Sequence, residues 1–294
     1  MDKYIFLDNW VFSKLLDDSF SRRLSAFIRK RNYTILLTRE LVTELYNPNW
    51  QEVGDRDRGF KVASLIGNCP SVIVHPKKVL DSEYLHFPKN INIIPVELDF
   101  KTIKDEYRSE AFLKVLRRDP LLLEQGIDIE KWSSDLKADK DSWIDIANQI
   151  IDTALENGTL KQNEQGEFVV EDEGKEVLLT SLDLRLFDNL DIDAFLGKAI
   201  ARKNKTGKLP RLRGTRIISL CHWYAYIKVD NANKLKRQGS DIVDYYHLSL
   251  VPYCSAFTVD TSISRLLEYI AKDVDISHCD FYTPKTLNDA IARY

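Results

Sequence analysis

The sequence of 294 residues has few cysteines and no long apolar run. Its four cysteines (Cys69, Cys221, Cys254 and Cys279) stand alone without a CxxC pair, which argues against a zinc site and a disulfide framework. No apolar stretch approaches the length of a membrane span, and the first residues lack the basic and apolar regions of a secretion signal. We therefore expect a soluble, cytoplasmic protein without a membrane partner.

Positive charge is not in excess either. The chain has 42 Lys and Arg residues against 45 Asp and Glu residues, which gives a formal net charge of -3. This balance argues against a protein that coats nucleic acid over its whole surface, but it allows a local basic patch. Internal repeats and low-complexity tracts are missing too, so we expect no disordered linker. With 44% hydrophobic residues, the chain can bury a substantial core.

Strand-like and helix-like segments alternate at both ends of the chain. Short β-branched and apolar runs predict strands at residues 4–7, 33–38, 71–76, 91–96, 256–259 and 279–283. Helical patterns lie between them, and this alternation is typical of an α/β fold with a central, mainly parallel sheet flanked by helices. The middle of the chain is instead highly charged and helix-rich. We therefore interpret 1–100 and 211–294 as the core and 101–210 as a mostly helical insertion.

Acidic residues stand at corresponding points of these segments. Asp8 and Asp260 each follow a strand at its carboxyl end, and Glu44 lies in the helix after the second strand. Asp241 and Asp244 open the helix before the strand at 256–259, and their spacing of three places them on one helix face. Because strand ends and helix starts lie at one edge of a parallel sheet, we expect these acids to converge there.

Read one at a time, the same residues have simpler interpretations. Asp8 and Asp241 fit helix or turn caps, and Glu44 fits a solvated helix residue. Read together, they form a cluster that needs cations, because like charges a few ångströms apart resist simultaneous ionisation. Hard divalent ions with oxygen ligands, Mg²⁺ or Mn²⁺, are the natural partners, and they activate water for phosphodiester hydrolysis. The pattern therefore favours a divalent metal ion as the partner of Asp8.

These segments resemble the PIN-domain nucleases. The similarity is carried by "IFLDNWVF", "ILLTRELVTELYNP" and "GSDIVDYYHLSLVPYCSAFTVDTSISRLL", with "FYTPKTLNDAIARY" as the closing strand and helix. It covers residues 1–95 and 214–294 and implies a PIN-like fold with Mg²⁺- or Mn²⁺-dependent cleavage. Many members carry Asn two residues after the first Asp, where this chain has Trp10 preceded by Asn9. The resemblance implies catalytic and metal-binding roles for Asp8, Glu44, Asp241 and Asp260, with Asp244 as a fifth metal ligand.

A basic stretch, "GKAIARKNKTGKLPRLRGTR" (197–216), contains no acid. It is either a solvated charged loop or a patch that binds phosphates and delivers a strand to the acidic site. The candidate phosphate-binding residues are Arg202, Lys203, Lys205, Lys208, Arg211, Arg213 and Arg216.

The resemblance favours RNA over DNA as the substrate of an endonuclease. The alternatives are a DNA-directed nuclease on the same fold and a degenerate PIN-like module that binds RNA or a protein without cutting. Toxin, RNA-processing and phage-defence roles all fit the sequence, as do a homo-oligomer and a regulatory protein partner.

Overall fold

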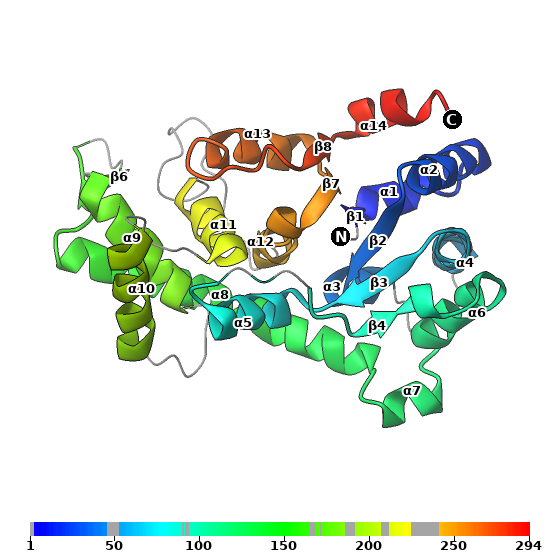
Figure 1. Cartoon of the computed structure of the whole chain (residues 1–294), viewed down its shortest axis with the longest axis horizontal. Coiled ribbons are helices and arrows are strands. Elements are labelled where there is room, and N and C mark those ends of the chain that lie inside the picture. Colours follow the sequence, from blue (N-terminus) through cyan, green and yellow to red (C-terminus); the bar gives the residue numbers. More distant parts are fainter. Residues whose placement is uncertain are drawn as a thin grey trace.

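The computed structural model describes residues 3–45, 53–89, 91, 94–164, 168–170, 172–185, 192–206, 212–224 and 241–294. Within these residues the centre is a six-stranded sheet with the strand order β4-β3-β2-β1-β7-β8 (Figure 1). The strands are β1 (Lys3–Phe6), β2 (Tyr33–Thr38), β3 (Ser71–Val74), β4 (Leu98–Asp99), β7 (Cys254–Thr258) and β8 (Asp280–Tyr282). Only the β3–β4 pair is antiparallel among these neighbours. The expected α/β fold with a mainly parallel sheet is confirmed.

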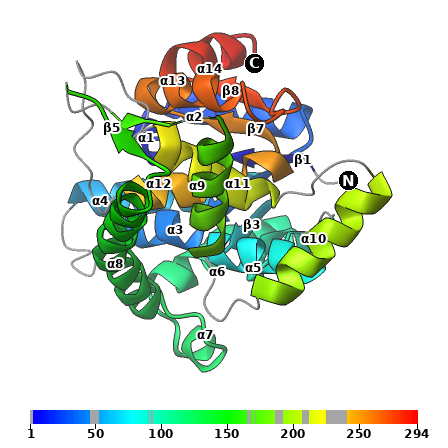
Figure 2. The same ribbon diagram turned by 90° about the vertical axis from the view of Figure 1, so that its left-hand side faces the viewer.

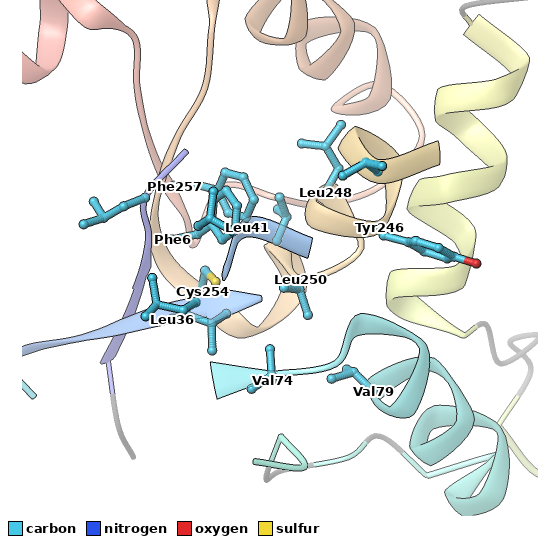
Figure 3. Packing of buried hydrophobic residues seen from close by; sticks show 14 of the residues in the cluster. Phe6, Leu36, Leu41, Val74, Val79, Tyr246, Leu248, Leu250, Cys254 and Phe257 are labelled. Carbon is cyan, nitrogen blue, oxygen red and sulfur yellow. The ribbon is translucent and has the colours of Figure 1, made fainter. Parts of the chain in front are cut away.

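The central strands are buried because their sequences are continuous apolar and β-branched runs. All six residues of β2 and all four of β3 are buried. Phe6 of β1 and Phe257 of β7 stack with their ring centroids 4.3 Å apart. Figure 3 shows these rings, together with Leu36 and Val74, in the apolar layer next to α12 (Asp241–Leu248). Such two-sided burial is what a parallel sheet covered by helices requires.

Helices cover both faces of the sheet (Figure 1). One side carries α1 (Asn9–Lys14), α2 (Asp18–Lys30), α4 (Val53–Asn68) and α6 (Asp105–Leu116). The other carries α5 (Pro76–His86), α11 (Arg213–His222), α12 and α13 (Thr261–Ile270). The remaining core elements are α3 (Arg39–Leu45), α14 (Pro284–Ile291) and the 3-10 helices η1 (Phe100–Thr102) and η4 (Val251–Tyr253). No helix in the described ranges is both long and apolar enough to cross a membrane.

The described part of 101–210 is mostly helical. Besides α6 it contains α7 (Pro120–Glu124), α8 (Ile129–Glu156), α9 (Asp172–Arg185), α10 (Ile192–Thr206) and the antiparallel pair β5 (Lys161–Gln162) and β6 (Phe168–Val169). α6 packs against α4, α9 against α11, and α8 against both α3 and α12. Figure 2 shows α8 beside α3. Apolar side chains of this segment, Phe112, Ile151 and Leu179 among them, belong to the same buried cluster as the sheet.

The strand predicted at 91–96 was wrong. The described residues of that range, 91 and 94–96, lie outside any strand, and the short strand β4 follows at Leu98–Asp99. Pro95 lacks the N–H that a strand interior needs. Pairing begins only after it, where the Glu97 N–H donates to the Ile73 carbonyl oxygen at 2.9 Å.

Candidate active site

The strand order reverses between β1 and β7. The chain leaves β1 toward β2 on one side, and it leaves β7 toward β8 on the other. In an open parallel sheet, connections that diverge in this way leave a crevice at the carboxyl ends of the two strands, where ligands bind. Asp8 follows β1 and Asp260 follows β7, so both stand at this crevice.

Both aspartates also cap helices. Asp8 accepts a hydrogen bond from the Asn9 N–H at 2.7 Å at the start of α1. Asp260 caps α13 by accepting from the Ile263 N–H at 2.7 Å, and it accepts from the Ser262 hydroxyl at the same distance. The interpretation of Asp8 as a helix cap is therefore confirmed.

The backbone of Asp8 is held by the neighbouring strand. Its N–H donates to Thr258 Oγ1 at 2.6 Å, and the same hydroxyl donates to the Phe6 carbonyl oxygen at 3.3 Å. Thr258 is buried at the end of β7. These two hydrogen bonds link the carboxyl ends of β1 and β7, and they fix the position of the Asp8 backbone from which the carboxylate extends.

The Asp8 carboxylate lacks a compensating positive charge. Burial raises its pKa to about 6; the Asn9 N–H acts in the opposite direction, and the negative charge of Asp260 raises the pKa further. Among the residues that the structure describes, no Lys, Arg or His pairs with Asp8. A partly buried carboxylate with a second carboxylate nearby is an arrangement that favours a bound cation.

A small cavity lies directly beside Asp8. Its volume is about 20 Å³, which is room for one water molecule or a small ion. Asp8 from the end of β1 and Asp244 from α12 both line it, with Phe6, Phe257 and His247 as part of the wall. Asp241 begins α12, but its side chain lies outside what the structure describes.

Glu44 of α3 lies within electrostatic reach of Asp8. Although Glu44 keeps contact with solvent, desolvation by the surrounding protein raises its pKa. The positive charge of Lys140 lowers this pKa, and the negative charge of Asp8 raises it. The structure therefore brings Asp8, Glu44, Asp244 and Asp260 to one edge of the sheet.

His247 completes the apolar wall of the cavity. Its Nε2 is 2.9 Å from Thr38 Oγ1, and its ring lies 4.9 Å from that of Phe6. Burial lowers the pKa of His247 to about 4, so the imidazole is neutral at pH 7. We interpret it as a packed histidine that keeps Thr38 and α12 in place.

Two further titratable residues at this edge were missed by the sequence analysis. Glu40 is only 3% exposed, and its Oε1 lies 3.5 Å from His75 Nδ1. The other carboxylate oxygen of Glu40 is buried and accepts no hydrogen bond in the described structure. A signal was present, because Glu40 closely follows β2 and His75 directly follows β3, as Asp8 and Asp260 follow their strands.

The basic stretch is divided between surface and core. Arg202, Lys203 and Lys205 are exposed in α10, which Figure 1 places at the outer edge of the molecule. Lys208 and Arg211 lie outside the described residues.

Arg213 and Arg216 differ from the exposed position expected of them. Arg213 is partly buried and donates to the Pro252 carbonyl oxygen at 3.1 Å. Arg216 is only 4% exposed and pairs with Asp183 at 3.1 Å and with Glu176 at 3.6 Å. Its guanidinium is therefore occupied inside the protein and is not placed to bind a phosphate.

The donor atoms of this site are of the type that a hard divalent ion binds. All four converging side chains are carboxylates, and Asp8 carries an uncompensated charge. In the described ranges, however, no three Asp, Glu, His or Cys side chains are grouped so that they could hold a metal ion. Mg²⁺ commonly binds through one or two carboxylates, keeps several waters and takes further oxygens from a substrate phosphate. A pair such as Asp8 and Asp244 is consistent with that mode.

Comparisons with known proteins add no relative: no family model, curated protein or solved structure matches this chain.

Proposed function

We propose that the protein is a metal-dependent endonuclease of PIN-like architecture, with RNA as its preferred substrate. The proposal rests on the environment of the Asp8 carboxylate. This carboxylate stands at the reversal of strand order, has its pKa raised by burial and by Asp260, and shares a cavity of about 20 Å³ with Asp244. Active sites are where carboxylates are held together against their mutual repulsion.

In this proposal the chain supplies oxygen ligands and holds them in position. Asp8 and Asp244 are the central ligands, Asp260 and Glu44 flank them, and Asp241 joins from the start of α12. The Thr258 hydroxyl and the Asn9 N–H fix Asp8 before any ion binds. A bound Mg²⁺ or Mn²⁺ would supply the activation of water and the charge that stabilises the leaving oxygen.

The other parts of the chain have subordinate roles in the proposal. Residues 101–210 act as a helical insertion on the PIN-like core. Of the basic stretch, we keep the exposed Arg202, Lys203 and Lys205 as phosphate contacts away from the reacting bond. Contacts of this kind contribute affinity without sequence specificity.

A non-cleaving module is the second candidate. It is favoured by one observation, namely that the described residues include no group of three potential metal ligands. A DNA-directed nuclease would use the same site and differs only in its substrate.

One assay separates these functions. Purified protein is incubated with end-labelled single-stranded and duplex RNA and DNA in Mg²⁺, Mn²⁺, Ca²⁺ or excess EDTA. We expect RNA cleavage in Mg²⁺ and Mn²⁺, poor cleavage in Ca²⁺ because its coordination shell is larger and looser, and none in EDTA. Asp260→Asn should lower the rate by at least about tenfold, while Asp17→Asn, at an exposed cap of α2, should leave it unchanged.

The other outcomes decide between the alternatives. Cleavage of DNA alone would establish the DNA-directed function. Tight binding of oligonucleotides without cleavage in any metal would establish the non-cleaving module. Cleavage that persists in excess EDTA would contradict a metal-dependent site.

A further inference from the structure

The long helix α8 of the insertion packs against two helices that carry residues of the acidic site. It packs against α3, which carries Glu44, and against α12, which carries Asp244 and His247 (Figure 2). Near the middle of α8, Asp139 and Lys140 are both partly buried. A segment that sequence reasoning separates from the core therefore contributes side chains to the edge where the acids converge.

The two residues act on different parts of this edge. Asp139 lies near charged residues that follow β2 and β3: burial raises its pKa, and the charges of Lys77, His75 and Glu40 also act on it. Lys140 acts on residues of α3 and α12. Beyond the effect of burial, its positive charge lowers the pKa of both Glu44 and His247. Lys140 is thus near the proposed metal ligand Glu44 and near the wall of the cavity beside Asp8.

The ammonium group of Lys140 is not held by a close partner. Among the described residues it forms no ion pair, in contrast to Lys175, which is fixed 2.7 Å from Asp273. Without a metal ion at the site, an unpaired lysine of this kind partly balances the negative charge of the nearby carboxylates. Once a divalent ion neutralises the carboxylates, the same ammonium group can donate to a phosphate oxygen.

We propose that Lys140 of α8 binds the phosphodiester of the substrate at the acidic site. This inference rests on the proposed nuclease function and extends it, because it assigns a substrate-binding residue to the insertion. In this role α8 determines where the phosphate lies relative to Asp8 and Asp244. Lys140 is a positioning residue, and the carboxylates remain the metal ligands.

The test compares Lys140→Gln with Lys140→Arg and with Lys137→Gln, an exposed lysine one turn earlier on α8. Binding of a fluorescent single-stranded RNA is measured by anisotropy in Ca²⁺ at several salt concentrations. We expect Lys140→Gln to weaken binding about tenfold, as expected for loss of a charged hydrogen bond. The slope of log K against log salt should fall by about 0.7, the value for one phosphate contact on a single strand. Lys137→Gln should behave like the wild type, and Lys140→Arg should retain most of the affinity.

A second readout needs no nucleic acid. Mn²⁺ binding, followed by calorimetry, should become severalfold tighter in Lys140→Gln, because a positive charge near the carboxylates has been removed. Melting curves establish that each variant is folded. In Mg²⁺, the cleavage assay should give a higher KM for Lys140→Gln and restoration by Lys140→Arg.

The failures are distinguishable. If the wild type cleaves RNA and Lys140→Gln matches it in RNA affinity, salt slope and Mn²⁺ affinity, Lys140 has no role at the site and the nuclease proposal stands. If folded Lys140→Arg is impaired as much as Lys140→Gln, the positive charge is not what matters and the inference is overturned. If the wild type neither binds nor cleaves any oligonucleotide, the proposed function itself fails, and the phosphate role of Lys140 with it.

Discussion

Replacement of Asp8 by Asn is expected to stabilise the metal-free protein at neutral pH. Burial, with the charge of Asp260 as a further contribution, raises the pKa of Asp8 from 3.8 to about 6 in the folded state. This difference corresponds to roughly 3 kcal/mol. Because the folded-state pKa is above the unfolded value, the folded protein binds the proton more tightly, and stability falls as the pH rises from 3.8 to about 6. Above about pH 6 the ionised Asp8 carboxylate destabilises the folded state by the full difference of roughly 3 kcal/mol.

The substitution keeps the local structure. Asn caps helices about as well as Asp, so its amide oxygen can accept the Asn9 N–H that now donates to Asp8. The bond to Thr258 is made by the backbone N–H and does not depend on the side chain. We therefore expect Asp8→Asn to raise the free energy of unfolding by about 1–3 kcal/mol at pH 7.5 in EDTA, and by close to zero near pH 4.

Urea unfolding at several pH values measures this effect. The matched control is Asp17→Asn, because Asp17 caps α2 through the Ser19 and Phe20 N–H groups but is exposed. Its effect should stay within about 0.5 kcal/mol at every pH. If Asp8→Asn were less stable than the wild type by the same amount at pH 4 and pH 7.5, Asp8 would be an ordinary cap and the reasoning would be refuted. Mg²⁺ should stabilise the wild type more than the variant, because binding to the native state adds to its stability.

Two further predictions test the packing of α11. Arg216→Gln should lower the free energy of unfolding by about 3–5 kcal/mol, because Asp183 loses its buried counter-ion; a loss below about 1 kcal/mol in urea unfolding would contradict the pairing. Gly214→Ala should cost about 2 kcal/mol or more, since a Cβ there would lie 2.4 Å from the Ser249 carbonyl oxygen. Gly197→Ala, in α10 with open space around the new methyl group, should instead gain up to about 1 kcal/mol, and equal melting shifts for the two glycine variants would disprove the close approach.

Local patterns were sufficient to find most of the strands and the acids that follow them. The run at 33–38 coincides with β2, and those at 71–76 and 256–259 overlap β3 and β7. A strand buried on both faces needs an uninterrupted apolar run, so its end is marked by the first residue that cannot stay in the core. That residue is Asp8 two positions after β1 and Asp260 two positions after β7. Their place at strand ends could therefore be predicted without knowing the strand order.

Which strand ends are neighbours was decided by the tertiary structure. β1 lies beside β7, so the Asp8 N–H meets Thr258 across a sequence separation of 250 residues. The same long-range packing buries Arg216 against Asp183, although Arg202, Lys203 and Lys205 of the same basic stretch are exposed. In each case the sequence near the residue gives no indication of the partner.

The same reason explains why Lys140 was not predicted at the site. An amphipathic pattern indicates that a helix buries one face, but it does not specify the surface against which that face packs. α8 reaches the acidic edge because it packs on α3 and α12, which come from segments far apart in the chain. Strand position follows from local burial, whereas the charges around Asp8 depend on contacts between segments far apart in the chain. The acids at the strand ends can therefore be found from local sequence patterns, whereas their surroundings follow from long-range packing that no local pattern encodes.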